Sequence, residues 1–435
     1  MSILSNPVLI SVVVLVVLCL RKINVLIALL LSALLAGALS GMSLIDATSK
    51  LVGGMGGNSE TALSYILLGI LASAMANTGI TEILSQKIEN IVQGKKFLFL
   101  GVIAIVACCS QNLIPVHIAF IPILIPPLLG MMNKMKLDRR AVACSLAFGL
   151  KAPYISLPFG FGLIFHGLIA KHMEANGIAL ATSEVWKGTW PLGISMVLGL
   201  VRGWFIFRKP RDYQDLPIPG QLEKSHEHMN METAHWVTLV AALMVMVINL
   251  KTGSLPLGAL SGIVVMVLGR AIKLDDFELV VNNGVRIMGL IAFVMLVAAG
   301  YSEVIKATGG VNQLVEASVA LVGDSKIMAA VMMMIRGLVV TIGIGSSFST
   351  IPVIATLFVP VCMRMGFSPL GCAMLIGAAA ALGDAGSPAS DTTLGPTSGL
   401  NADGQHNHIW DTCVPTGVLY NTPLAICAII LSPFM

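Results

Sequence analysis

Apolar stretches of about 20 residues recur along almost the whole chain, which is the length that an α-helix needs to cross a bilayer. Hydrophobic residues make up 56% of the chain and charged residues 11%, more apolar side chain than a soluble core can bury. The surplus must face lipid, where only helices or closed barrels satisfy their backbone. The sequence therefore predicts an all-α membrane protein that crosses the cell inner membrane many times.

The charge pattern and the cysteines argue against other classes of protein. The net charge is only +4 and the basic residues are dispersed at segment ends, so we expect no nucleic acid partner. The eight cysteines show no Cys-x-x-Cys spacing, so neither a disulfide framework nor a cysteine metal centre is predicted. The sequence holds no Ser-His or His-Glu-x-x-His arrangement, so we expect no enzyme activity and no cofactor.

The chain matches itself without gaps between positions 44–79 and 274–309, at a constant offset of 230 residues. Gly79, for example, pairs with Gly309. Two shorter matches follow in the same order, which makes chance a poor explanation. We therefore divide the chain into a first membrane repeat (1–207), a cytoplasmic linker (208–232) and a second membrane repeat (233–435).

The same series of elements is expected in each repeat. Two apolar helices and an amphipathic connector lead into a third helix, and a hairpin that contains proline follows. An interrupted helix and a last helix complete the repeat. The expected ranges are 7–20, 23–41, 61–78, 97–131, 141–168 and 189–207 in the first repeat, and 235–250, 255–271, 287–305, 327–366, 369–400 and 415–433 in the second.

Polar residues at the hairpin tips cannot face lipid, because unpaired donors and acceptors are costly there. We therefore expect each hairpin to be re-entrant, which leaves five crossing helices and one broken helix in each repeat. An odd number of crossings inverts the second repeat relative to the first. Basic residues agree with two inverted repeats, since placing Arg21 and Lys22 inside also places 95–96, 134–140 and 208–211 inside.

The segment 383–399 is the strongest candidate for chemistry, because it interrupts an apolar stretch with two carboxylates, several hydroxyls and repeated Gly and Pro. Helix breakers free carbonyl oxygens, which together with hydroxyl and carboxylate oxygens suit Na⁺. Ionisable groups at membrane depth usually belong to an ion or proton pathway. We expect Asp384, Ser387, Ser390 and Asp391 to carry ion or proton coupling, with Na⁺ at Asp384 and Asp391.

Lys151 lies in Gly149–Pro153, which corresponds in the first repeat to this interruption. A base in one half and an acid in the other suggest that the ammonium of Lys151 occupies the cation position of the first repeat. The alternative is a structural ion pair, in which Lys151 or Arg336 neutralises one of the carboxylates. Both interpretations place Lys151 within a break of its helix.

Neutral polar residues at the hairpin tips supply donors and acceptors that can clamp a small polar solute from two sides. Hydrogen bonds between helices are the alternative use of the hydroxyl groups. The expected substrate-binding residues are Ser110, Gln111, Asn112, Lys151, Ser347, Ser349, Thr350, Thr392 and Thr393.

The second break resembles the signature of the NhaC-type Na⁺/H⁺ antiporter family, which has the form Gly-Asp-Lys-x-Ser-Pro-x-Ser-Asp-Thr-Thr. Ala385 stands where the family has lysine, and the sequence that follows looks more like the YuiF-type branch, which is regarded as a group of amino-acid permeases. The residues that match the signature are Gly383, Asp384, Ser387, Pro388, Ser390, Asp391, Thr392 and Thr393.

This resemblance covers essentially the whole chain. It implies the ion-transporter architecture, in which scaffold helices surround a transport domain of two hairpins and two broken helices, and it suggests a homodimer. We expect transport of a small amino acid, with histidine as one candidate, driven by Na⁺ or H⁺. Na⁺/H⁺ antiport without an organic substrate is the alternative. The absence of the signature lysine at Ala385 favours an organic solute.

Overall fold

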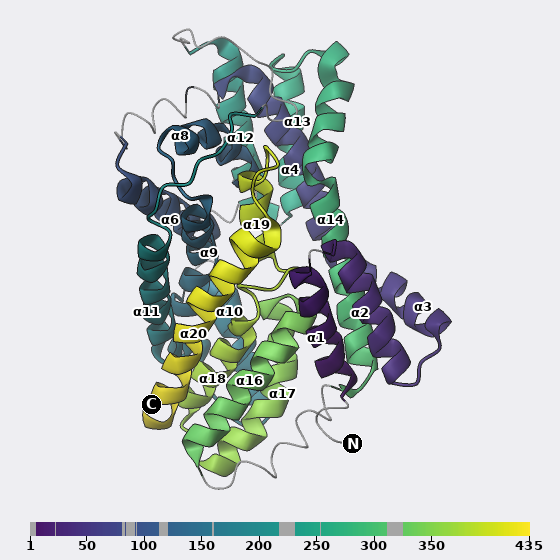
Figure 1. Ribbon diagram of the computed structural model, residues 1–435, viewed down its shortest axis with the longest axis vertical. Helices are drawn as coiled ribbons and strands as arrows, with labels where there is room; N and C mark the ends of the chain where they lie inside the picture. The colour runs from purple at the N-terminus through teal and green to yellow at the C-terminus, as the bar shows by residue number, and fades with distance from the viewer. Residues whose placement is uncertain are drawn as a thin grey trace.

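The computed structural model describes most of the chain, and each regular element within the described residues is a helix (Figure 1). This result confirms the predicted all-α class. The described residues are 6–21, 23–80, 83, 92, 94–112, 121–158, 161–216, 231–252, 254–310 and 325–435.

The helices follow one another in two similar series. In the first predicted repeat they are α1 (Pro7–Leu20), α2 (Val25–Leu39), α3 (Leu44–Gly54), α4 (Ser59–Thr78), α6 (Lys96–Asn112), α7 (Ile121–Leu124), α8 (Leu129–Lys134), α9 (Arg139–Ser156), α10 (Phe161–Ala175) and α11 (Thr182–Ile206). In the second they are α12 (Thr233–Thr252), α13 (Leu255–Leu268), α14 (Phe277–Ala307), α16 (Lys326–Ile344), α17 (Ser347–Met365), α18 (Pro369–Leu382), α19 (Asp391–Leu400), the π-helical turn η6 (His408–Cys413) and α20 (Val414–Leu431).

Most of these helices begin and end close to the expected positions, but the two third helices differ from each other. In the first repeat a 3₁₀ turn, Met55–Asn58, separates α3 from α4. In the second repeat the connector and the third helix form one continuous helix, so α14 begins well before position 287. Two glycines within the 3₁₀ turn, Gly56 and Gly57, explain the interruption, because glycine weakens a helix interior.

The expected break of the first interrupted helix at Lys151 is wrong. α9 continues through Lys151 and Pro153 to Ser156. The helix ends where Leu157 precedes Pro158, and Leu157 has the extended backbone that a residue before proline prefers (φ −108°, ψ 133°). α9 and α10 are bent by 48° across this break.

Several of the helices can span a bilayer by length and composition. Within the described residues four segments do so alone, and the bent pair of α9 and α10 adds a fifth if it crosses as one unit. The chain is therefore a multi-pass membrane protein, whereas five crossings in each repeat stay a prediction. The four segments are Thr182–Ile206, Met288–Ala307, Lys326–Gly343 and His408–Phe434.

α4 and α14 pack against each other in opposite directions. Just before α4, the last residue of α3, Gly54, lies against Gly300 of α14, where a Cβ atom on Gly54 would come within 3.1 Å of the Gly300 Cα. Near the other end, a Cβ on Gly284 would come within 2.4 Å of the Ile70 Cα. The two contacts are equivalent at the offset of 230 residues, so corresponding positions of the two predicted repeats meet at both ends of this interface.

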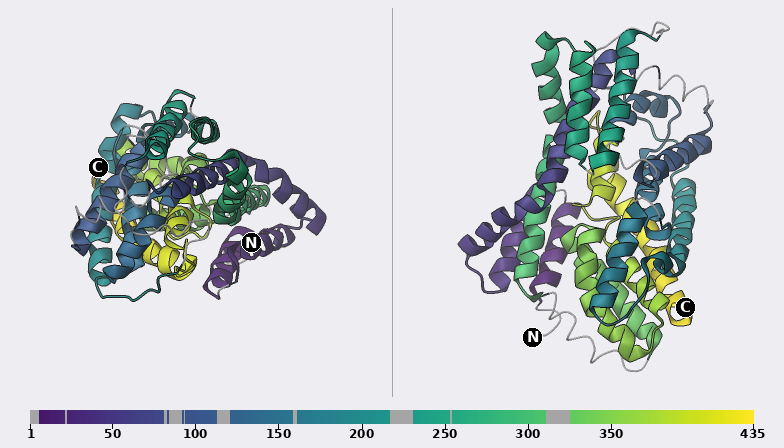
Figure 2. Two further views of the ribbon diagram at one scale, coloured as in Figure 1. Left: turned by 90° about the horizontal axis from the view of Figure 1, so that it is seen from above. Right: turned by 180° about the vertical axis from the view of Figure 1, so that it is seen from behind.

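The helix pair that precedes α4 packs on α14, and the pair that precedes α14 packs on α4, so each pair contacts the third helix of the other predicted repeat. α2 packs on α14 and stays close to α1, whereas α13 packs on α4 and stays close to α12. Together α1 to α4 and α12 to α14 form one group of helices, which runs along one side of the molecule (Figure 2). We call this group the scaffold helices.

The two hairpins close in the same way. The Nζ atom of Lys96 donates a hydrogen bond of 3.0 Å to the carbonyl of Lys136. The Nζ atom of Lys326 donates one of 2.6 Å to the carbonyl of Gly366, which is the equivalent pair at the same offset. The two ends of each hairpin therefore lie side by side. α16 and α17 pack together and against α18, and α6 packs against α9.

Candidate functional site

The second broken helix is interrupted as the sequence predicts, between Leu382 and Asp391. Gly386 turns the chain with a φ of 102°, a conformation that side chains disfavour, and a Cβ there would lie 2.8 Å from the Cα of Gly417. The Ser390 side chain then caps α19 by accepting from the backbone N–H of Thr392 at 3.1 Å. The local sequence thus fixes a short unwound segment inside a buried helix.

Asp384 lies in this unwound segment and accepts hydrogen bonds from hydroxyl groups of three different elements. The Tyr154 hydroxyl of α9 donates to it at 2.9 Å, and the Ser347 hydroxyl at the start of α17 does so at 2.8 Å. Ser390 and Thr392 donate from the break itself and the first turn of α19. The Asp384 cluster (Tyr154, Ser347, Asp384, Ser390 and Thr392) is buried, and Asp384 is 6% exposed.

This arrangement joins the two predicted repeats at one carboxylate. Tyr154 comes from the broken helix of the first repeat, and Ser347 from the hairpin of the second. The two hydroxyls also contact each other at 2.9 Å. One carboxylate surrounded by hydroxyl oxygens is a hard, oxygen-rich set of ligands, of the kind that binds Na⁺ or carries a proton.

Asp391, the second predicted carboxylate, contacts the scaffold helices. Its Oδ1 atom accepts a hydrogen bond of 3.2 Å from the hydroxyl of Tyr65 in α4. Asp391 is also the first residue of α19, and the dipole of this helix favours a negative charge at its N-terminus.

Lys151 is fully buried in α9 and reaches an amide rather than a carboxylate. Its Nζ atom donates to the Asn421 side-chain oxygen at 3.4 Å, and the Asn421 nitrogen donates to the carbonyl of Ala385 at 2.7 Å. Lys151 is thus linked to the second break through Asn421. Arg336 does not neutralise Asp384 either: within the described part of the chain, Asp384 accepts hydrogen bonds from hydroxyl groups and forms no ion pair, and the buried Nη2 atom of Arg336 has no hydrogen-bond partner.

The remaining predicted residues divide into two groups. Thr393 donates to the carbonyls of Ser387 and Ser390 and so fixes the shape of the break, whereas Thr350 donates to Ser346 within its own helix. Neither hydroxyl donates to Asp384. The side chains of Ser110, Gln111, Asn112 and Ser349 lie outside the described residues.

His408 is a site residue that sequence reasoning missed as a candidate. Its Nδ1 lies 2.8 Å from the Thr397 hydroxyl, and its Nε2 lies 2.9 Å from the Pro388 carbonyl. It begins the π-helical turn η6, and such turns often occur at functional sites. Tyr65, Tyr154 and Asn421 were missed as well. The available signal was the polar tip that each carries within an apolar stretch.

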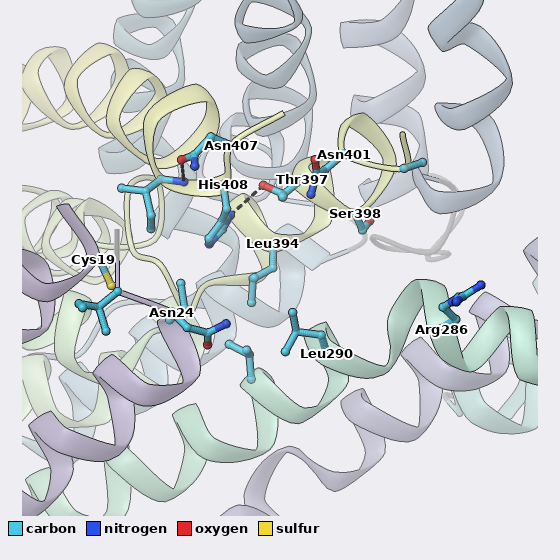
Figure 3. A pocket seen from close by; sticks show the side chains of 15 residues that line it. Cys19, Asn24, Arg286, Leu290, Leu394, Thr397, Ser398, Asn401, Asn407 and His408 are labelled. Atoms are coloured by element: carbon cyan, nitrogen blue, oxygen red, sulfur yellow. Dashed lines mark hydrogen bonds between the residues drawn. The ribbon is translucent and has the colours of Figure 1, made fainter. Parts of the chain in front are cut away.

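A cavity of about 440 Å³ lies next to this histidine (Figure 3). One wall is formed by the turn between α1 and α2 and by α14, and the other wall is formed by α19 and η6. The cavity therefore lies between the scaffold helices and the second broken helix. The labelled residues that line it are Cys19, Asn24, Arg286, Leu290, Leu394, Thr397, Ser398, Asn401, Asn407 and His408.

A buried ion pair holds the C-terminal end of α19 against the start of α9. Arg139 donates two hydrogen bonds of 2.6 Å to the carboxylate of Asp403, and the side chains are 0% and 2% exposed. Burial raises the pKa of Asp403, but the hydrogen bonds and positive charge of Arg139, together with hydrogen bonds from Gln405, outweigh burial and hold that pKa below its usual range. Arg211, from the expected cytoplasmic linker, forms an ion pair of 2.8 Å with Asp411, so the start of this linker is held against η6. Residues 217–230 of the linker lie outside the described residues.

The described residues hold no cluster of three His, Cys, Asp or Glu side chains that could bind a metal. The oxygen atoms around Asp384 are the set that could receive an alkali cation, with the Tyr154, Ser347, Ser390 and Thr392 hydroxyls as additional ligands.

Comparison with known proteins agrees with a transporter. A family model described as the Na⁺/H⁺ antiporter family matches residues 145–432, and a second Na⁺-H⁺ antiporter family model matches residues 6–92. A membrane protein of Vibrio parahaemolyticus is 47% identical over 97% of this chain and 98% of its own length. The YuiF protein of Bacillus subtilis, whose name proposes amino acid transport, is 44% identical over 86% of this chain and 87% of its own.

Two solved structures are also similar to the chain, each at 14% identity. They are the YdaH transporter of Alcanivorax borkumensis, with a TM-score of 0.43 over 90% of this chain and 88% of that one, and MtrF of Neisseria gonorrhoeae, with a TM-score of 0.42 over 90% and 85%. The matches to the family model and to the relatives show that this multi-pass membrane transporter belongs to the Na⁺/H⁺ antiporter family.

Proposed function

We propose that the protein is a secondary active transporter of the inner membrane that couples the movement of Na⁺ or H⁺ to that of a small amino acid. The observation that carries this proposal is the position of Asp384. A buried carboxylate in an unwound segment accepts hydrogen bonds from the broken helix of one repeat and the hairpin of the other. Buried ionisable groups in membrane proteins usually serve ion or proton pathways.

Asp384 is the coupling residue in this proposal. A cation bound there is coordinated by the carboxylate, and the hydroxyls of Tyr154 and Ser347 turn their oxygen atoms toward the cation. Because these hydroxyls come from α9 and α17, cation binding draws the first broken helix and the second hairpin toward the second break. A ligand that favours one arrangement of these elements shifts the protein toward that arrangement.

The amino acid part of the proposal is supported by the name of the YuiF relative and by Ala385, which removes the signature lysine from the break. Lys151 stands close by and is linked to the Ala385 carbonyl through Asn421. In this proposal its ammonium replaces a second cation, so that one ion site remains near Asp384.

Na⁺/H⁺ antiport without an organic substrate is the second candidate, and the match to the antiporter family model favours it. Reconstituted protein distinguishes the two functions. Uptake of labelled amino acids, histidine included, is measured in proteoliposomes under imposed Na⁺ and pH gradients. Uptake driven by either gradient supports the proposal. If no amino acid enters while a Na⁺ pulse moves protons, the antiporter function replaces it.

A further inference from the structure

The cavity beside His408 has the size and position of a binding site for a small molecule. Its volume of about 440 Å³ lies within the range of roughly 300 to 1,000 Å³ that is common for such sites. It lies between the scaffold helices and the second broken helix, which are the two parts that alternating access moves relative to each other. A solute in this cavity would contact both parts at once.

The lining combines one cation with neutral polar groups and an apolar surface. Among the described residues that line it, Arg286 is the only charged one, and no Asp or Glu is present. Arg286 lies at the end of the cavity away from Asn24 (Figure 3). An arginine with no acidic residue beside it in the described lining favours a carboxylate group and disfavours a second cation.

The opposite wall can accept hydrogen bonds from an ammonium group. The Ser398 hydroxyl donates to the Gly395 carbonyl at 2.6 Å, which leaves the lone pairs of its oxygen available. Leu290 and Leu394 add apolar surface beside Arg286 and Ser398, on the side toward Asn24 (Figure 3). The combination fits a zwitterion with an uncharged side chain.

The cavity is also connected to the ion site through the chain. His408 lines it and contacts both the Pro388 carbonyl, inside the break, and the Thr397 hydroxyl of α19. The same helix α19 begins at Asp391 and carries Thr392, which donates to Asp384. A solute that contacts His408 and Leu394 therefore acts on the segment that holds the coupling residue.

We propose that this cavity binds a neutral, zwitterionic α-amino acid, with Arg286 facing its carboxylate, Ser398 facing its ammonium group and Leu290 contacting its side chain. This inference rests on the proposed function and adds a site to it. The site consists of residues other than those of the hairpin tips and the Asp384 cluster.

Binding to purified full-length protein in nanodiscs tests the inference. The probes are labelled histidine and labelled leucine, with lysine as a competitor. Leu290→Trp fills the cavity and is expected to weaken binding of both probes at least about tenfold. Leu279→Trp is the matched control, because Leu279 lies on the same helix, is 56% exposed against 59% for Leu290, and does not line the cavity. We expect the control to bind like the wild type.

A second variant keeps the test decisive if Leu290→Trp does not fold. Arg286→Gln should weaken histidine binding about tenfold, while Arg202→Gln, an exposed arginine of α11, should not. Lysine should compete poorly. Unchanged binding in Leu290→Trp and Arg286→Gln, or equal losses in the variants and their controls, would overturn the site while leaving the proposed function intact. A wild-type protein that binds neither probe would also overturn the site, and the uptake measurement in proteoliposomes would then decide the proposed function separately.

Discussion

The hydroxyl of Tyr154 donates a hydrogen bond of 2.9 Å to a carboxylate oxygen of Asp384, and this bond joins the first broken helix to the second. The two residues are 2% and 6% exposed. A hydrogen bond to a buried charge is worth about 1.5 to 3 kcal/mol. In the proposed function, this bond links the coupling residue to the other repeat strongly enough to influence ion affinity.

Removing this hydroxyl should alter the affinity for the coupling ion more than the fold. Tyr154→Phe is expected to raise the half-saturating concentration of the driving ion about tenfold, because one ligand and one link between repeats are lost. Ion-dependent uptake in proteoliposomes measures this change. Tyr301→Phe is the matched control, since Tyr301 is also a buried tyrosine but its hydroxyl contacts Ser11 rather than Asp384. Equal shifts in both variants would contradict the assignment.

Breaking the buried pair between Arg139 and Asp403 should destabilise the protein strongly. Arg139→Gln leaves the Asp403 carboxylate buried without its partner, which costs about 3 to 5 kcal/mol. Lys187→Gln removes an exposed pair with Glu184 and should cost less than about 1 kcal/mol. Thermal unfolding in detergent compares the two variants. Similar melting temperatures would refute the structural importance of the buried pair.

The same pair predicts how stability depends on pH. The pKa of Asp403 is held below its usual range in the folded protein, so its ionised form stabilises the fold. This contribution is fully present above the unfolded pKa of about 3.9 and is lost as the pH falls through the lower folded pKa. Melting temperatures measured from neutral to acidic pH should therefore fall more steeply for the wild type than for Asp403→Asn. Parallel curves would contradict the prediction.

The close approach of α4 and α14 should tolerate no side chain at Gly284. A Cβ there would lie 2.4 Å from both the backbone nitrogen and the Cα of Ile70, so Gly284→Ala should destabilise the protein by about 1 to 3 kcal/mol. Gly289→Ala, on the same helix, would meet the side chains of Val285 at 3.5 Å and Ile66 at 4.0 Å, which are ordinary contacts, and should be nearly neutral. Thermal unfolding of both variants provides the measurement, and a stable Gly284→Ala variant would argue against this packing.

The sequence predicted the features that depend on local signals. The helices, the hairpins and the second break could be identified because apolar length and the positions of Gly and Pro act within a few residues. Asp384 could be identified as a candidate site residue because a carboxylate inside an apolar stretch is unusual. The prediction placed Lys151 in a helix break because Pro153 was expected to interrupt the helix. Instead the helix continues through Pro153 and ends just before Pro158.

The partners of these residues could not be predicted in the same way. Tyr154 and Tyr65 reach the carboxylates from helices far away in the sequence, and periodicity contains no information about such contacts. The cavity beside His408 depends on how α14 packs next to α19, which is also a tertiary property. The constant offset between the repeats was the sequence feature that came closest to predicting long-range contacts. Lys96 and Lys326, which are equivalent at this offset, make equivalent hydrogen bonds in the structure.

The most direct test of the central claim compares gradient-driven uptake by the wild type and by Asp384→Asn. The variant keeps the shape of the side chain but removes its charge, so the account predicts that Na⁺ or pH gradients no longer drive amino acid uptake. Asp275→Asn, at an exposed aspartate in the 3₁₀ turn Leu274–Asp276 just before α14, is the control and should transport like the wild type. Full gradient-driven uptake by a folded Asp384→Asn protein would contradict the account.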